Sequence, residues 1–175
     1  MYLKTAEIVA KANHLVRRYG TRDPYELADA QGIRIFPRPF VKQRGAYCFF
    51  ARSPYIFINS NLDPVMEYIV LYHELGHHNL HLDVALNMGV FREFNLFDMQ
   101  NNRMEYEANI FASQIELSDE EVLDYIESGF DIQQIAAAMD SDINLVALKI
   151  DTLISQGYRL RRQDHKSTFL KYPNT

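Results

Sequence analysis

The pentapeptide His-Glu-Leu-Gly-His at positions 73–77 restricts the fold and chemistry of this chain more than any other stretch. On a helix, residues four apart lie on one face about one turn from each other, so His73 and His77 can direct two imidazoles to one point. Such a pair suits a Zn²⁺ ion. Glu74 lies about 100° round the helix from His73, too far to share that point but close enough to hold the metal's water. The spacing therefore predicts two zinc ligands and a general base.

Chance is the competing explanation for the histidine pair, because the chain has six histidines and several can fall four residues apart. Two features near the motif favour the metal site. The apolar stretch 65–72 leads into the motif and predicts a buried helix. Gly76 costs about 1 kcal/mol in a helix interior, a penalty usually tolerated where another group must come close to the backbone.

A third metal ligand has two candidate sources downstream of the motif. Asp83 lies six residues after His77, as in one zinc-peptidase pattern, but that pattern needs a glycine at position 80, where this chain has Leu80. The other source is a glutamate on a separate helix, as in His₂Glu sites that leave the fourth position to water. The segment 103–117 is predicted to form such a helix.

One face of this second helix has the residues that a metal site would need. The residues that share it at helical spacing are Glu105, Ala108, Asn109 and Ala112. The alanines let the two helices approach closely, and Asn109 can accept a hydrogen bond from the outer N–H of a ligand histidine. Glu107 lies about 200° round from Glu105, away from the alanines, so Glu105 is the preferred ligand.

Two more side chains are candidate neighbours of the site. His81 lies four residues beyond His77 and could be a further polar group near the metal, although a helix-end histidine more often bonds to carbonyls or solvent. A donor to an oxyanion is also expected, and Arg103, His81 and the tyrosines are all candidates.

Composition limits the class of protein. The 175 residues suffice for one domain with a real core, and the single Cys48 cannot form an internal disulfide, which favours a reducing cytoplasm. No stretch has the length of a signal peptide's apolar run or a membrane helix, so no membrane association is expected. A net charge of −5 makes nucleic acid an unlikely main ligand.

The segments before the motif predict a small sheet flanked by helices. Helical or strand periodicity marks segments 6–19, 24–30, 33–36, 46–51 and 55–59. The last two predict an antiparallel hairpin, one edge of which could receive an extended peptide. We therefore expect an α+β fold with a small antiparallel three-stranded sheet, followed by a motif helix capped by Asp63.

The rest of the chain predicts a connector and a helical C-terminal part. Segment 81–102 is rich in Leu, Met and Phe, and could be either a lid over the site or part of the core. Residues 118–175 predict a helical subdomain similar to a helix-turn-helix, with a loose tail. Its helix at 142–156 has Lys149 as its single basic residue, which argues against DNA contacts.

The motif at 73–77, followed by Glu105-Tyr106-Glu107-Ala108-Asn109-Ile110-Phe111-Ala112, resembles the ImmA/IrrE family of zinc metallopeptidases. The glutamate helix also resembles that of other gluzincins, and the order of elements matches the family over nearly the whole chain. The resemblance implies a zincin-type peptidase domain at 1–117, with a Zn²⁺ cofactor held by His73, His77 and Glu105. Glu74 would be the catalytic base.

The resemblance also implies a protein substrate, typically a helix-turn-helix repressor whose cleavage releases genes of a mobile element or stress response. Many gluzincins have aspartate where this chain has Asn109, and an amide orients a histidine without raising its basicity as a carboxylate does. Two other functions stay open. The chain could be a metal-binding regulator without peptidase activity, or a DNA-binding protein that uses its C-terminal helices. The sequence does not predict an oligomeric state.

Overall fold

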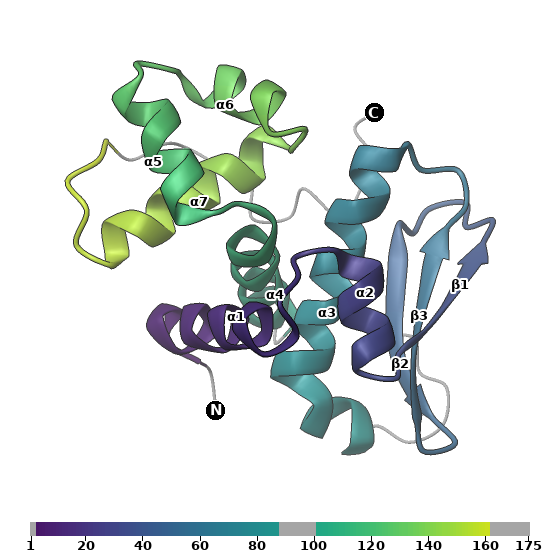
Figure 1. Cartoon of the computed structure of the whole chain (residues 1–175). Helices are drawn as coiled ribbons and strands as arrows, with labels where there is room; N and C mark the ends of the chain where they lie inside the picture. Colours follow the sequence, from purple (N-terminus) through teal and green to yellow (C-terminus); the bar gives the residue numbers. More distant parts are fainter. Residues whose placement is uncertain (1–2, 88–100, 162–175) are drawn as a thin grey trace.

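The structure is a computed structural model that describes residues 3–87 and 101–161. The α+β class is confirmed. The elements are α1 (Thr5–Tyr19), α2 (Pro24–Ala30), β1 (Arg34–Arg38), β2 (Gly45–Phe50), β3 (Ser53–Asn59), α3 (Pro64–Asn87), α4 (Asn101–Glu116), α5 (Asp119–Glu127), α6 (Ile132–Ala138) and α7 (Ile143–Ser155). α3 packs against the sheet, α4 packs on the other side of α3, and α1 and α7 pack on α4 (Figure 1).

The sheet has three strands in the order β1-β3-β2. The predicted hairpin is confirmed, because β2 and β3 pair antiparallel with Tyr47 opposite Ile56. The prediction of a fully antiparallel sheet is wrong, since β1 pairs with β3 in parallel. The chain reverses between β1 and β2 and again between β2 and β3. A first strand that pairs with the third must therefore run in the same direction, and the sheet is mixed.

The motif helix α3 begins as predicted and extends further. Pro64 starts it, and Asp63 Oδ1 accepts a hydrogen bond from the Met66 N–H at 3.0 Å. The helix continues to Asn87, but His81 has non-helical backbone angles (φ −124°, ψ 19°) that mark a kink. Of the connector predicted as a lid or core segment, residues 88–100 lie outside the described part of the chain.

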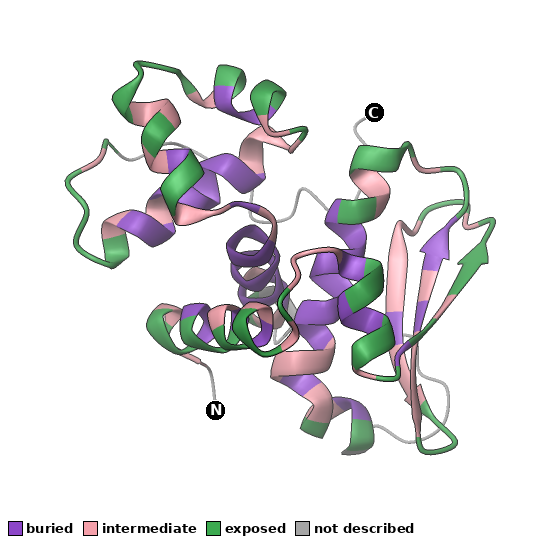
Figure 2. Cartoon of the chain, viewed as in Figure 1, coloured by how far each residue is buried: buried purple, intermediate pink, exposed green. Residues whose placement is uncertain are grey.

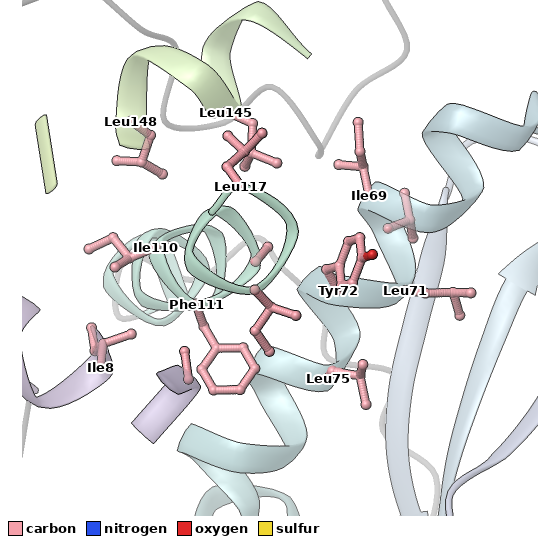
Figure 3. Packing of buried hydrophobic residues seen from close by; sticks show 14 of the residues in the cluster. Ile8, Ile69, Leu71, Tyr72, Leu75, Ile110, Phe111, Leu117, Leu145 and Leu148 are labelled. Carbon is pink, nitrogen blue, oxygen red and sulfur yellow. The ribbon is translucent and has the colours of Figure 1, made fainter. Parts of the chain in front are cut away.

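α4 lies at the centre of the hydrophobic core. Apolar side chains from α1, α3 and α7 surround it, and Figure 3 shows Phe111 and Ile110 among Ile8, Leu75 and Leu148. Figure 2 shows that burial is concentrated on α3, α4 and part of α7. α7 therefore shares one core with the motif helices, while the predicted domain boundary after residue 117 stays a prediction. None of the described helices is both long and apolar enough to cross a membrane.

Candidate metal centre

α3 and α4 come into backbone contact at the motif. A Cβ atom built on Gly76 would lie 3.0 Å from both the Cα and the carbonyl oxygen of Ala108. Such a distance is tighter than nearly all real Cβ contacts, so a side chain at this position would press against the backbone of α4. The prediction that Gly76 admits a neighbouring backbone is confirmed, and Ala108 supplies that backbone.

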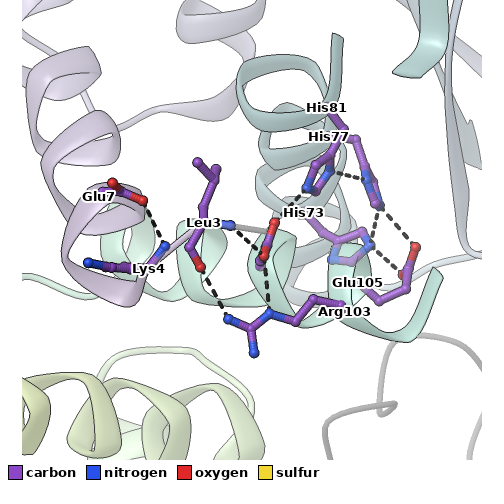
Figure 4. A network of polar contacts seen from close by, with 9 residues as sticks. Leu3, Lys4, Glu7, His73, His77, His81, Arg103 and Glu105 are labelled. Atoms are coloured by element: carbon purple, nitrogen blue, oxygen red, sulfur yellow. Dashed lines mark hydrogen bonds and ion pairs between the residues drawn. The ribbon is translucent and has the colours of Figure 1, made fainter. Parts of the chain in front are cut away.

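This approach brings three ligand-type atoms together between the helices. His73 Nε2 lies 3.1 Å from Glu105 Oε2 and 3.1 Å from His77 Nε2, and His77 Nε2 lies 3.3 Å from Glu105 Oε1 (Figure 4). All three residues are buried, with exposed fractions of 5%, 2% and 3% for His73, His77 and Glu105. Of the described residues, these three form the one cluster whose geometry could hold a metal ion.

The hydrogen-bond partners of His73 show why the cluster requires a positive charge. Asn109 Oδ1 lies 2.7 Å from His73 Nδ1 and can only accept, so Nδ1 carries a hydrogen and a neutral ring leaves a lone pair on Nε2. Glu105 Oε1 is buried and accepts no hydrogen bond from a described residue, although the His77 ring lies nearby. Converging acceptors of this kind, two imidazoles and one carboxylate, fit a divalent metal such as zinc.

The charges of the cluster follow from burial and from mutual attraction. Burial opposes protonation of His73, but the carboxylates of Glu105 and Glu74 outweigh it and raise the pKa of His73 in the metal-free protein. Burial alone would raise the pKa of Glu105, and the His77 and His73 rings outweigh it and hold that pKa far below its usual range. The two shifts have one cause, since the Glu105 carboxylate and a protonated imidazole stabilise each other.

Glu74 lies beside the cluster and below an edge of the sheet. Its side chain is 5% exposed, and burial raises its pKa, while the two motif histidines and a backbone hydrogen bond from Tyr47 lower it in part. A Cβ on Gly45, the first residue of β2, would lie 3.0 Å from Glu74 Oε1. β2 pairs with β3 and with no other described strand, so its second edge has no strand beside it in the described part of the chain.

The two predicted neighbours, His81 and Arg103, both bond to Glu107. His81 Nδ1 lies 3.1 Å from His77 Nδ1, and its Nε2 lies 3.2 Å from Glu107 Oε2. Burial lowers the pKa of His81 to about 3, so its ring is neutral. Arg103 donates from Nε to Glu107 Oε1 at 3.1 Å.

Sequence reasoning missed the roles of Glu107 and Gly45. The sequence places Glu107 away from the alanine face of its helix, yet Glu107 is 2% exposed and bonds to His81. Two four-residue spacings in the sequence, His77 to His81 and Arg103 to Glu107, indicate that these side chains can contact one another. The signal for Gly45 was a glycine at the start of an aromatic strand, which often marks a close approach.

A buried His-Glu-x-x-His helix that faces a glutamate on a second helix defines the gluzincin class of metallopeptidase. Residues 28–150 match the family model described as the IrrE N-terminal-like domain. The chain belongs to the ImmA/IrrE family of metallopeptidases.

Two curated relatives agree with this family. An uncharacterised immunity region protein 2 of Bacillus phage phi105 is 35% identical over 143 residues, which cover 81% of this chain and 88% of the relative. Metallopeptidase ImmA of Bacillus subtilis (strain 168) is 30% identical over 130 residues, which cover 73% of this chain and 74% of the relative.

Proposed function

We propose that this protein is a zinc-dependent endopeptidase in which His73, His77 and Glu105 hold the metal and Glu74 is the general base. The observation that carries the proposal is the convergence of three buried acceptor atoms within 4.8 Å of one another. The buried carboxyl group of Glu74 lies beside them. When bound, zinc would supply a Lewis acid that acidifies a water molecule and polarises the scissile carbonyl.

Glu74 would transfer the proton between water and the leaving amine. Its buried position raises its pKa towards the range where a carboxylate can accept a proton from water and later return it. The neighbouring histidine rings lower the pKa of Glu74 and so limit that rise. The β2 backbone fixes the carboxylate by its hydrogen bond from Tyr47.

The open edge of β2 is the proposed binding site of the substrate backbone. An extended peptide can add to a sheet edge through main-chain hydrogen bonds. Gly45 brings this edge next to Glu74 Oε1, so a peptide that pairs with β2 would pass the proposed base. The absence of a side chain at Gly45 keeps Val70 and Glu74 in place below the strand.

The proposed substrate is a helix-turn-helix transcriptional repressor of a mobile element. The similarity to a phage immunity region protein and to a protein named ImmA supports a protein substrate connected with phage immunity. A repressor substrate would act on DNA inside the cell, so we place this activity in the cytoplasm.

The test replaces Glu74 with glutamine in the full chain and co-expresses a helix-turn-helix repressor as the candidate substrate. Zinc content should stay equal to that of the parent, while the rate of repressor cleavage should fall by about 10²- to 10⁴-fold, because general-base catalysis contributes that factor. Glu120→Gln is the matched control, since Glu120 is exposed on α5. Cleavage that survives Glu74→Gln would contradict the mechanism, and a parent chain that holds zinc without cleaving would favour a regulator.

DNA binding through α6 and α7 is the weaker second function. Lys149, the single basic residue of α7, is fully buried and bonds to Gln114 Oε1 at 2.7 Å, with Asp119 as its ion-pair partner. It therefore stabilises the contact between α4 and α7 and is not available to a phosphate. A gel shift with duplex DNA that weakens with salt and depends on sequence would contradict this ranking.

A further inference from the structure

We propose that His81 and Glu107 form a positioning pair that fixes the tautomer of His77 and so aims the Nε2 lone pair of His77 at the metal. The inference rests on the proposed zinc centre. It gives a role to two buried residues that the catalytic mechanism above does not use.

The three side chains form a continuous chain of contacts inside the protein. His77 Nδ1 lies 3.1 Å from His81 Nδ1, and His81 Nε2 lies 3.2 Å from Glu107 Oε2 (Figure 4). Exposed fractions of 2%, 5% and 2% for His77, His81 and Glu107 leave little room for water to take the place of any partner. The helix kink falls at His81, so the backbone departs from helical geometry at the residue that joins the two others.

The carboxylate of Glu107 decides where the hydrogens of this chain lie. A carboxylate can only accept, so His81 must carry its hydrogen on Nε2, and a neutral His81 then has a lone pair on Nδ1. That lone pair must receive the hydrogen of His77 Nδ1. Because a neutral imidazole has one N–H, His77 Nε2 is left with its lone pair directed into the cluster with His73 and Glu105.

The other oxygen of Glu107 is held by two donors from elsewhere in the fold. Oε1 accepts from the Leu3 backbone N–H at 3.0 Å and from Arg103 Nε at 3.1 Å, and a second Arg103 nitrogen donates to the Leu3 carbonyl at 3.1 Å. These contacts fix the carboxylate and leave Oε2 for His81. The segment before α1 thus helps to set the orientation of a proposed metal ligand.

The two ligand histidines are therefore supported in different ways. His73 is oriented by the amide oxygen of Asn109, which fixes a tautomer without adding charge. His77 is oriented by a carboxylate acting through a second imidazole, which fixes the tautomer. Glu107 thus supplies at His77 the charged support that Asn109 does not supply at His73.

Glu107→Gln tests the proposal because the existing donors predict how the amide will turn. Leu3 N–H and Arg103 Nε require an acceptor, so the glutamine oxygen should face them and its NH₂ should face His81 Nε2. His81 would then carry its hydrogen on Nδ1 and donate it to His77, whose own hydrogen would move to Nε2 and oppose the metal. Glu116→Gln makes the same chemical change at the far end of α4, where the carboxyl group neighbours Ser141, and serves as the matched control.

The measurements are zinc affinity, by competition with a chromophoric chelator, and imidazole tautomers, by long-range ¹H–¹⁵N spectra of the metal-free full chain. Glu107→Gln should weaken zinc binding about 10- to 100-fold and move the His81 hydrogen from Nε2 to Nδ1, while Glu116→Gln should change neither. In a His81→Leu background, Glu107→Gln should change zinc affinity by less than about twofold, because the connection is already broken.

Several results would overturn the proposal, and none depends on proteolysis. Unchanged zinc affinity in Glu107→Gln would overturn it. A weaker zinc affinity in that variant with the His81 hydrogen still on Nε2 would overturn it too. If the variant does not fold, the tautomers of the parent protein test the proposal. The proposal requires hydrogens on His77 Nδ1 and His81 Nε2, and any other placement would overturn it. A parent that binds no zinc contradicts the proposed function instead, and the His81 tautomer of the metal-free chain still tests the positioning pair.

Discussion

Three lone pairs meet between His73, His77 and Glu105, and this arrangement is stable only with a positive charge among them. In the metal-free protein the carboxylates of Glu105 and Glu74 raise the pKa of His73 despite the opposing effect of burial, and so favour a proton at this ring. Proton and metal therefore compete for one place, and the outcome depends on pH.

Zinc affinity should consequently rise with pH. Below the raised pKa of His73, zinc must displace a proton, so the apparent affinity should increase up to about tenfold per pH unit and level off above that pKa. Titration calorimetry in buffers of different ionisation enthalpy would report the proton released at each pH. An affinity that stays constant from pH 6 to 8, with no proton released, would contradict this description of His73.

At the scale of elements, the pair α3 and α4 makes the site, and their separation is set by a glycine and an alanine. Gly76→Ala should improve helix propensity by about 1 kcal/mol, yet the new methyl group would lie 3.0 Å from backbone atoms of Ala108. Backbone atoms cannot move aside as a flexible side chain can. We expect a net loss of about 1 to 3 kcal/mol in the free energy of unfolding, together with weaker zinc binding.

Denaturant unfolding of the metal-free variant measures the first effect, and chelator competition measures the second. Gly20→Ala is a useful comparison, because Gly20 has open space around it and a positive φ of 70° that strains any other residue. It should lose stability without a change in zinc affinity. If Gly76→Ala binds zinc as tightly as the parent, the close approach of the helices does not control the site.

The elements also show which parts of the structure could be predicted from the sequence. The sequence was enough to predict that His73, His77 and Glu105 converge, because a regular helix fixes which residues share a face. Gly76 and Ala108 indicated the contact between the two helices. The pairing of Glu107 with His81 could not be predicted. It depends on a kink within α3, and on a segment near Leu3 that covers the face of α4 away from the metal.

The sheet illustrates the same limit. Strand periodicity located β2 and β3 because a hairpin is a local structure, and the two strands pair over the whole length of β2. The direction of β1 is decided by which strand it pairs with, and that choice depends on packing between distant segments. Local patterns therefore predicted three strands without predicting a mixed sheet.

At the scale of the molecule, the metal should contribute to the stability of the whole fold. α4 holds Glu105 and also forms the middle of the core shared by α1, α3 and α7. Zinc in excess of its dissociation constant by about a thousandfold should stabilise the folded chain by about 4 kcal/mol, because the unfolded chain lacks the site.

A chelator such as EDTA should therefore lower the thermal midpoint by several degrees, and added zinc should restore it. Circular dichroism at 222 nm follows this transition. Magnesium added in place of zinc should not restore the midpoint, because Mg²⁺ prefers oxygen ligands and waters over imidazoles. A midpoint that does not respond to the chelator would mean that metal binding and folding are independent.

One residue of α4, Glu105, completes the proposed metal site that His73 and His77 of α3 begin. The most direct test is the zinc content of the purified full chain after dialysis, for the parent and for Glu105→Ala. Three protein ligands predict about one zinc per chain in the parent and almost none in the variant. Equal zinc content in the two proteins, or no zinc in either, would contradict the metal centre and the peptidase mechanism that depends on it.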